Sequence, residues 1–428
     1  MYHLFMSSFL RKSACLVILF FLCGSSFSNE RLLRSQDVAA DRRKSELDPL
    51  GVHLYGFKLL PKFGWETEYK DNIFKDEDGL VNDFITHIQP GFALNSDWNR
   101  HSVNLAIDSD IAFYGQNNSE DYQDMNIRLN GRLDVLRDSA LDGGFFFSKN
   151  HGDRGSPDDA AGLEPTVSTL KGFNLGYKHK FNRFSAKIGM IAQHIDYINK
   201  QTSLGTTINM QDRNNWHYVP SLRLGYEIQP QYEAFVEMRY SELIYDEQFD
   251  DNGLQRSSHG YEGLMGIAFD ATGLLTGDVA IGYKQRTIDD ARLSSISGMT
   301  GRLNLEWNPT PLMTVRSVIS HSIGETTQIG VAGVDNYSAN LGVEHELLRS
   351  LLLRLNTSYF INQYNGFDET AFDDERRESG YGFGAGARYL MSRYVTVDVS
   401  YRFNKRNVNY VGGDYAVNQV FFNLIGHL

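Results

Sequence analysis

The stretch YQDMNIRLNGRLDVLRD, residues 122–138, alternates apolar and polar side chains over a length that few folds accommodate. Its apolar side chains stand at every second position: Met125, Ile127, Leu129, Leu133 and Val135. Because successive side chains of a strand point to opposite faces, this run predicts a strand with one apolar and one charged face. Ordinary strands of soluble sheets have about 5 to 6 residues, so a run roughly twice that length points to an unusual sheet.

The same pattern recurs from about Phe57 to Leu428 without a linker or a change in composition. Roughly eighteen runs of this kind follow one another, each on the order of 12 to 17 residues long, well above the usual strand length. Short turns are predicted at 98–99, 137–139, 182–183, 229–231, 271–273, 308–311, 348–350 and 391–393. Long, mostly acidic loops are predicted at 71–78, 116–121, 151–165, 199–212, 246–256, 288–292, 324–331, 366–377 and 407–413. Strict alternation of tight turns and long loops indicates an all-β, up-and-down antiparallel barrel of about 18 strands.

Alternation alone also fits a soluble sandwich with its apolar face inward, and the aromatic residues separate the two possibilities. Three pairs lie eight residues apart on the apolar face of three different runs: Tyr218 and Tyr226, Tyr261 and Phe269, and Tyr381 and Tyr389. Eight residues at roughly 3.3 Å each, tilted by about 40°, cover about 20 Å of height. Aromatic girdles with that spacing bound the apolar band of a membrane barrel. We therefore expect the apolar face to meet lipid and the charged face to line a water-filled lumen.

The predicted inward face carries charges of both signs, which would be costly in a dry protein core but are hydrated in a wide barrel. Candidate pore-lining residues are Asp108, Asp110, Arg128, Arg132, Arg223, Arg239, Arg286, Arg302, Arg316, Arg354, Arg388 and Arg402. Acidic and lysine side chains share this face: Glu66, Glu68, Asp134, Glu227, Glu237, Lys284, Glu306 and Asp398. Cross-strand ion pairs that stiffen the wall are the alternative role for any single one of these charges.

The amino-terminal region has the features of an export signal. Arg11 and Lys12 precede an apolar run from Ala14 to Leu22, and small residues follow up to Ser28. We predict a signal peptide at 1–28, a periplasmic arm at 29–56 and a transmembrane barrel at 57–428. Both cysteines, Cys15 and Cys23, lie within the predicted signal, so disulfides are not expected in the exported chain.

The net charge and hydropathy narrow the possible partners. The chain has 41 basic and 53 acidic residues, a formal net charge of −12, which argues against a nucleic-acid partner. After Leu22 no run of about 18 apolar residues occurs, so no membrane-spanning helix is expected. Alternation of apolar residues continues to the last residue, Leu428, as in a strand that outer-membrane assembly machinery recognises.

Several stretches resemble a known family. They are LDPLGVHLYGF, EYKDNIF, RGSPDD, YEAFVEMRY, FDATGLLTGDVAIGY, WNPTPLMTV, HELLRSLLL and SRYVTVDVSYRFNKR. In this order they resemble the outer-membrane beta-barrel porin family of alphaproteobacteria, a group often described beside exopolysaccharide secretion. The resemblance runs from about Asp48 to Leu428 and implies a monomer-sized outer-membrane barrel, without implying a substrate.

The third long loop, HGDRGSPDDAAGLEP, is the candidate constriction, because the third loop of general porins folds into the lumen. It carries five charged residues that would act there: Asp153, Arg154, Asp158, Asp159 and Glu164. A solvated surface loop is the alternative. The acidic stretch GFDETAFDDERRE at 366–378 and DEDG at 76–79 have the composition of cation sites, but a charged, solvated loop explains both more simply.

An outer-membrane lipase is the enzymatic rival, and it would need a Ser and a His together on the lipid-facing wall. Ser185 and His194 lie on one run but nine residues apart, so they are not expected to meet. Ser320, His321 and Ser322 are adjacent, which places neighbours on opposite faces. No motif for a metal, a cofactor or a phosphate stands in a suitable context, so we expect no enzyme activity, no cofactor and no metal site.

The sequence therefore predicts a Gram-negative outer-membrane porin-like channel for passive diffusion of small hydrophilic solutes, with both termini in the periplasm. Its expected partners are outer-membrane lipid, lipopolysaccharide and the assembly machinery. Two alternatives keep the barrel and change its role. One is a conduit for secreted polysaccharide that works with export proteins, and the other is a plugged structural or adhesive surface barrel.

Overall fold

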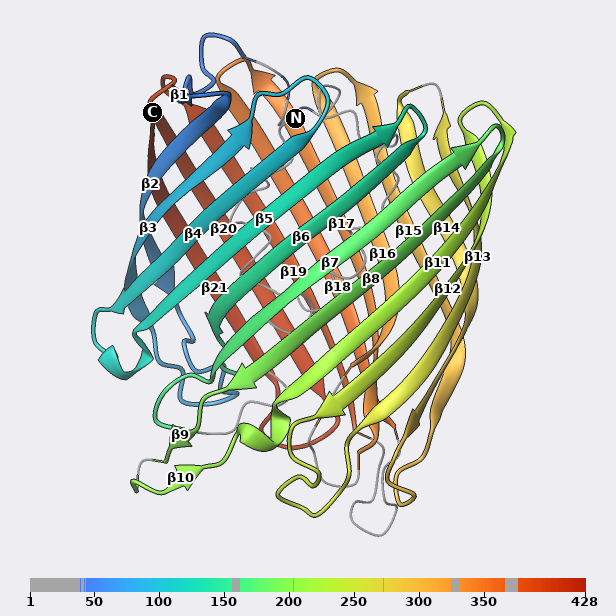
Figure 1. The fold of residues 1–428 in the computed structure, drawn as a ribbon. Coiled ribbons are helices and arrows are strands. Elements are labelled where there is room, and N and C mark those ends of the chain that lie inside the picture. Colours follow the sequence, from blue (N-terminus) through green and yellow to red (C-terminus); the bar gives the residue numbers. More distant parts are fainter. Residues whose placement is uncertain are drawn as a thin grey trace.

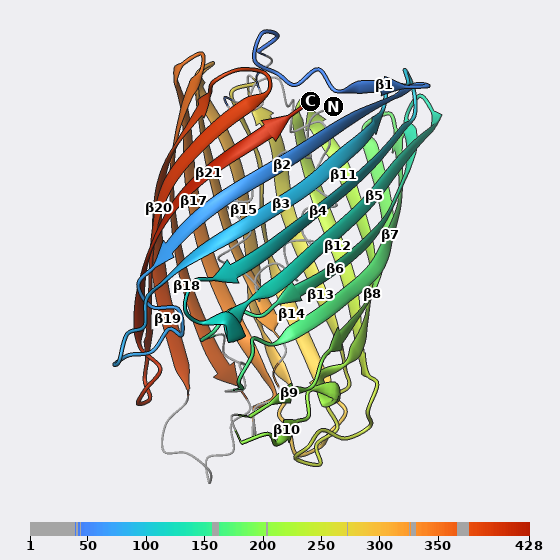
Figure 2. The ribbon, with the colours of Figure 1, turned by 90° about the vertical axis from the view of Figure 1, so that its left-hand side faces the viewer.

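The strands close into a single antiparallel barrel. The computed structural model describes residues 39, 42, 44–155, 162–202, 204–271, 273–324, 326, 331–365 and 376–428. Eighteen long strands each pair with their neighbours in the sequence, which confirms the predicted all-β, 18-stranded barrel. The first and last of them, β2 and β21, pair antiparallel from Lys62 opposite His427 to Lys70 opposite Gln419 and lie side by side in Figure 2. This pairing removes both free edges of the sheet, as a membrane environment requires.

The barrel strands contain 12 to 16 residues each. Their bounds are β2 Phe57–Lys70, β3 Asp83–Ser96, β4 Ser102–Tyr114, β5 Tyr122–Leu136, β6 Ser139–His151, β7 Val167–Phe181, β8 Phe184–Tyr197, β11 Asn215–Gln229, β12 Tyr232–Tyr245, β13 Ser258–Ala271, β14 Leu275–Ile288, β15 Ile296–Thr310, β16 Met313–Gly324, β17 Gly333–Leu348, β18 Leu351–Asn365, β19 Arg377–Leu390, β20 Val395–Val408 and β21 Tyr415–His427. Small elements complete the chain: β1 Val52–Leu54 on β2, the hairpin of β9 Lys200–Gln201 and β10 Thr207–Ile208, and the 3₁₀ turns η1 Asn118–Glu120 and η2 Gln211–Arg213.

All eight short connections lie at one end of the barrel, which we call the turn end, and all nine long ones lie at the other, the loop end (Figure 1). The carboxyl terminus and β1 are at the turn end, where the Gly51 amide donates to the Leu428 carbonyl at 2.9 Å. One turn differs from the prediction of 308–311, because β15 runs on to Thr310. The register shifts between Trp307 and Thr310, and this irregularity accommodates Pro309, which has no amide to donate.

The apolar positions form the exposed, convex face of the barrel. In β5, Leu129 is 40% exposed and Leu133 is 47% exposed, whereas Glu66 and Glu237 on the other face are 6% and 4% exposed. Outward rings contact one another across neighbouring strands, as at the loop end, where the ring of Tyr240 lies 5.0 Å from that of Tyr261 in a tilted arrangement. Exposure of large apolar side chains all round a closed sheet is explained by contact with lipid.

The concave face has a small apolar core. Phe235, Leu264, Ala268 and Ala280 pack together on the inner side of β12, β13 and β14, and polar side chains surround them. Among the described residues, no helix is long and apolar enough to cross a membrane. The predicted signal peptide and most of the acidic stretch at 366–378 lie outside the described residues.

Candidate functional site

The lumen is lined by the side chains that alternate with the exposed apolar row. All twelve candidate pore-lining residues stand on this inward face, as their strand register places each of them opposite another inward side chain. Most of them stand in ion pairs, either along one strand, as Arg132 with Asp134 of β5 at 2.8 Å, or between strands, as Asp108 of β4 with Lys62 of β2 at 2.6 Å. Pairing along the wall therefore engages much of the charge that the sequence places in the lumen.

The inward ion pairs of β11–β16, from Arg223 to Arg316, form a group that we call the paired wall. Glu237 is its centre, since three guanidinium groups surround one buried carboxylate. Arg239 and Arg302 reach it at 2.5 and 2.8 Å, and Arg223 lies 3.9 Å away while stacking over the ring of Phe235. Arg302 also binds Asp278 at 2.9 Å. The charges balance one another, so this wall is held rigid rather than left with isolated charges.

Further pairs continue the pattern on β15–β20. Arg316 bridges Glu306 and Glu344 at 3.1 and 3.0 Å. Asp398 accepts hydrogen bonds from both Arg354 and Arg388. Midway along the barrel, Arg402 of β20 lies over the ring of Phe421 of β21, 5.0 Å from its centroid.

A buried histidine connects two acidic residues on the opposite side of the lumen. The ring nitrogens of His87, which has no exposed surface, lie 3.2 Å from Glu68 and 3.1 Å from Asp110. These side chains come from β3, β2 and β4 and lie near the loop end. Asp110, a predicted pore-lining residue, is thereby also part of the wall.

The third loop starts with an ion pair that ties it to the first strand of the barrel. Asp153 binds Lys75, in the loop after β2, and lies 3.8 Å from Lys70 at the loop end of β2. Burial favours the neutral form of Asp153, but Lys75 and Lys70 outweigh it and lower the Asp153 pKa. Burial likewise opposes the charge of Lys75, but Asp153 outweighs it and raises the Lys75 pKa. We call this pair the latch.

The next two residues of the third loop, Arg154 and Gly155, also contact other parts of the barrel. Arg154 makes a two-pronged, buried contact to Glu120 of η1, at 2.9 and 2.5 Å. The carbonyl of Gly155 accepts a hydrogen bond from Arg406 of β20. Between β6, where this loop begins, and β20 lie β3, β4 and β5 and the closing strands β2 and β21. The described start of the loop therefore reaches well across the loop end of the barrel.

Two of the five predicted constriction residues, Asp153 and Arg154, stand in these contacts. Glu164 is exposed, and Asp158 and Asp159 lie outside the described residues. Sequence reasoning missed the partners Lys75, Glu120 and Arg406, because each belongs to another loop or strand and no local pattern links it to the third loop.

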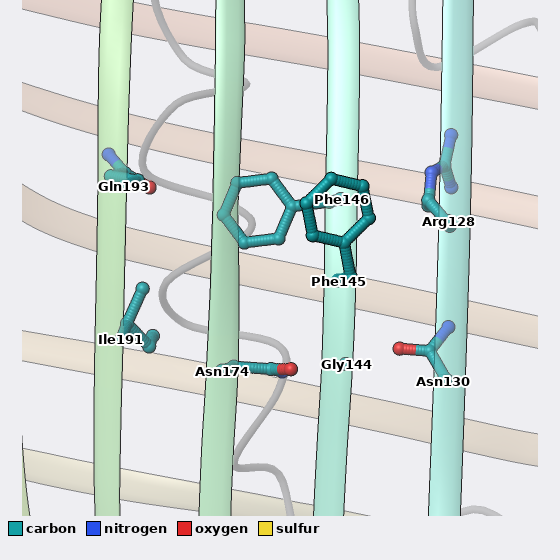
Figure 3. A pocket seen from close by; sticks show the side chains of 8 residues that line it. All are labelled: Arg128, Asn130, Gly144, Phe145, Phe146, Asn174, Ile191 and Gln193. Carbon is teal, nitrogen blue, oxygen red and sulfur yellow. The ribbon is translucent and has the colours of Figure 1, made fainter.

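A recess opens in the inner wall of β5–β8 (Figure 3). Phe146 lies in it beside Gly172, and Arg128 and Gln193 border it. The side-chain oxygens of Asn130 and Asn174 both lean over Gly144, at 2.8 and 2.4 Å from where a β-carbon would stand there. The oxygen of Asn174 is buried, and among the described residues it accepts no hydrogen bond. The recess thus offers amide groups and an aromatic ring with a single charged side chain.

At the turn end, the amino-terminal arm contacts the barrel wall far from β2, the strand that follows it in the sequence. The amide of Ala39 donates to Thr314 Oγ1 at 3.0 Å, and Ala39 is fully buried. Arg42 and Lys44 lie 2.7 and 3.5 Å from the two carboxylate oxygens of Glu346 on β17. Burial lowers the pKa of Lys44 in spite of Glu346. Four strands, β18–β21, separate β17 from β2, so the arm lies across part of the turn-end mouth.

The candidate lipase residues do not come together. His194 pairs in register with outward-facing Trp216, whereas Ser185 lies on the inward face and donates to Glu233 at 2.9 Å. His321 binds Asp335 at 2.8 Å and stacks on Tyr337, and Ser320 contacts Ser338 on the other face.

Solved structures match this chain at low similarity. The ferric citrate transporter FecA in the unliganded form shares 12% identity with a TM-score of 0.46, over 85% of this chain and 61% of FecA. OccK3 (OpdO) of Pseudomonas aeruginosa shares 12% identity with a TM-score of 0.43, over 86% of this chain and 96% of its own. OccAB4 of Acinetobacter baumannii shares 12% identity with a TM-score of 0.44, over 86% and 98%. The chain thus spans less than two thirds of FecA.

No curated protein matches this chain. A family model described as "Putative beta-barrel porin 2" matches residues 45–427, almost the whole of the part that the structure describes. The match covers the closed barrel, its lipid-facing apolar surface and its polar lumen, and it confirms the porin family that the sequence motifs resemble. The chain is an outer-membrane β-barrel of the porin-like channel type, and it belongs to the family of beta-barrel porin 2 proteins.

Proposed function

We propose that this barrel is a passive channel for small hydrophilic solutes, which cross the outer membrane by diffusion. The observation that carries the proposal is the inward face, on which charged and amide side chains run from the turn end to the loop end of the barrel. A water-filled lumen keeps such groups hydrated, and a barrel of about eighteen strands is wide enough for one. Pore width and the ladder of lumen charges would then sort the solutes.

The proposed orientation places the turn end and both termini in the periplasm and the loops outside the cell. Short turns on the periplasmic side and longer loops outside are the usual arrangement of such barrels. A peptide tag inserted beside Asn252, in the loop between β12 and β13, should be labelled on intact cells. A tag after Leu428 should be labelled only after the outer membrane is opened, and the reverse result would contradict the orientation.

The conductance of the purified chain in a planar bilayer tests the channel directly. We expect steady, ohmic current steps, and swelling of protein-containing vesicles in neutral solutes up to a size limit. Folding of the purified chain is verified by the shift in gel mobility between the native and the boiled barrel. A chain that is folded and inserted but passes neither ions nor solutes would contradict the proposal.

A second candidate, the plugged barrel, has a specific observation in its favour. The arm contacts the turn-end wall through Arg42, Lys44 and Glu346, and the described start of the third loop contacts neighbouring loops at the loop end through Asp153 and Arg154. The double variant Glu346→Gln and Asp153→Asn weakens both contacts. If the wild-type barrel is silent and this variant conducts, the arm and the loop are plugs.

A further inference from the structure

A compact group of ionisable side chains lies on the outer wall, away from the lumen. His194 and Asp196 belong to β8, and Asp246 follows the last residue of β12, so all three stand at the loop end. His194 is 5% exposed, and its ring lies 4.6 Å from that of Trp216 on the neighbouring β11. Trp216 stacks in turn on Tyr218, an outward-facing residue of the aromatic girdle. The proposed channel makes no use of this group.

Both nitrogens of the His194 ring face a carboxylate. Nδ1 lies 3.0 Å from Asp196 Oδ2, and Nε2 lies 2.9 Å from Asp246 Oδ2. A neutral imidazole has one N–H and one lone pair, so one carboxylate would face the lone pair and be repelled. A cation at that position removes the repulsion, and it is either a second proton or a metal ion.

The surroundings of the two carboxylates differ and show which nitrogen is free to bind. Asp196 Oδ2 also lies 3.1 Å from the Lys171 ammonium, which balances its charge. Asp246, by contrast, is bound through its carboxylate to His194 alone among the described residues. Asp246 is therefore the carboxylate that is free to bind a cation, and a cation held between Asp246 and Nε2 leaves Nδ1–H to donate to Asp196.

We propose that His194 Nε2 and Asp246 bind a divalent transition-metal ion of the zinc class, and that Asp196 positions the imidazole. A metal-binding histidine usually donates its other N–H to a carboxylate, which is the role that the geometry assigns to Asp196. Two ligand atoms about 2.1 Å from a tetrahedral zinc ion stand about 3.4 Å apart. His194 Nε2 and Asp246 Oδ2 lie 2.9 Å apart, so a small separation of the two side chains lets both contact one ion.

The donor set selects the class of metal. Imidazole nitrogen suits zinc, copper and nickel, whereas calcium and magnesium prefer sites built from oxygen alone. The two proposed ligand atoms, His194 Nε2 and Asp246 Oδ2, lie 2.9 Å apart, so the site is compact enough for a single ion. Asp196 and Asp246 are 38% and 37% exposed, and the remaining coordination positions are open on the outer side of the barrel.

Zinc binding by the purified full chain, carrying no polyhistidine tag, tests the proposal in detergent. Calorimetric titration with ZnCl₂ should give one binding event that His194→Ala and Asp246→Asn abolish. Asp196→Asn should keep the event with about 10- to 100-fold weaker affinity, as expected for loss of an orienting partner. Zinc should also raise the unfolding temperature of the wild type and leave that of Asp246→Asn unchanged.

The chain offers a matched control in His259, which stands on the outward face at the loop end of β13, 3.8 Å from the single carboxylate of Asp289. His259→Ala should bind zinc as the wild type does. The gel-mobility shift verifies that each variant is folded, and calcium titration should give no event. Equal zinc binding by the wild type and Asp246→Asn, or no binding by the wild type, would overturn the proposal. Neither result depends on conductance, so the channel proposal stands or falls separately.

Discussion

Two stretches of the inner wall, the paired wall of β11–β16 and the wall of β5–β8, differ in how far their polar side chains are bonded to one another. On the paired wall, Glu237 is surrounded by Arg223, Arg239 and Arg302, and nearly every charge has a partner on the next strand. On the wall of β5–β8, amides and Phe146 border the recess, and the oxygen of Asn174 has no partner among the described residues.

The two walls differ in what their polar side chains do: those of the paired wall stabilise the barrel, and those of the recess wall can bind a passing solute. Charges that neutralise one another hold neighbouring strands in register and have little attraction left for a solute. Amide groups with unused hydrogen-bonding capacity interact with whatever passes, including water. Variants on the paired wall should therefore change stability, and variants on the recess wall should change it little.

The largest effect is expected at the centre of the paired wall. Glu237→Gln leaves three guanidinium groups around a neutral amide, and the free energy of unfolding should fall by about 2 to 4 kcal/mol, because an uncompensated buried charge remains. Urea unfolding in lipid vesicles measures it. Glu233→Gln is the matched control, since Glu233 is 24% exposed and binds a single arginine. Its effect should be about 1 kcal/mol or less. An equal loss of unfolding free energy in both variants would contradict the central role of Glu237 in the paired wall.

Two asparagines test the contrast between the walls directly. Asn304 on the paired wall donates to Asp278 at 3.0 Å, so Asn304→Ala should lower the free energy of unfolding by about 1 kcal/mol. Asn174→Ala removes a buried oxygen that has no hydrogen-bond partner in the described part of the chain, so the same measurement should show no loss or a small gain. A loss at Asn174 as large as that at Asn304 would mean that the recess wall is as tightly bonded as the paired wall.

The latch should affect the current more than the stability. Asp153→Asn removes the ion pair with Lys75 and Lys70, and the freed start of the third loop should add brief closures or larger steps to single-channel recordings. The free energy of unfolding should change by less than about 1 kcal/mol, as expected for a partly exposed ion pair. Asp97→Asn, at the turn end, is a control that should leave the recordings unchanged.

The smallest effect is expected from pH. Because the pKa of Asp153 is lowered, its ion pair stabilises the third loop fully at a pH above the ordinary aspartate pKa of about 3.9. This stabilisation is lost as the pH falls through the depressed pKa. Because the pKa of Lys75 is raised, its ion pair with Asp153 stabilises the loop fully at a pH below the ordinary lysine pKa of about 10.4. This stabilisation is lost as the pH rises through the raised pKa. Channel closures should therefore be constant between about pH 5 and 9. A transition inside that window would mean that other groups hold the loop.

The alternation of residues predicted the strands, the turns and the face of each lumen charge, because a period of two is a local property of the chain. It did not predict which charges meet. Arg302 reaches Glu237 across three strand pairings, and Asp153 meets Lys75 from another loop. The recess depends on the register that sets Gly144 between Asn130 and Asn174, and His194 meets Asp246 only because β11 brings β8 beside β12. Such contacts follow from barrel closure and register, which no single segment encodes.

The central claim is that lipid hydrocarbon, not protein, surrounds the apolar face of these strands. Cys15 and Cys23 are the only cysteines of the chain and lie in the predicted signal peptide, so spin labels can be attached at single cysteines introduced one by one at residues 125–134. Collisions with oxygen, which dissolves in hydrocarbon, and with a water-soluble nickel chelate are then measured in vesicles. We predict a two-residue period, with oxygen favoured at Ile127, Leu129 and Leu133 and the nickel chelate favoured at Arg128 and Asn130. Labels at the apolar positions that are shielded from oxygen, or reached equally by the nickel chelate, would contradict the account.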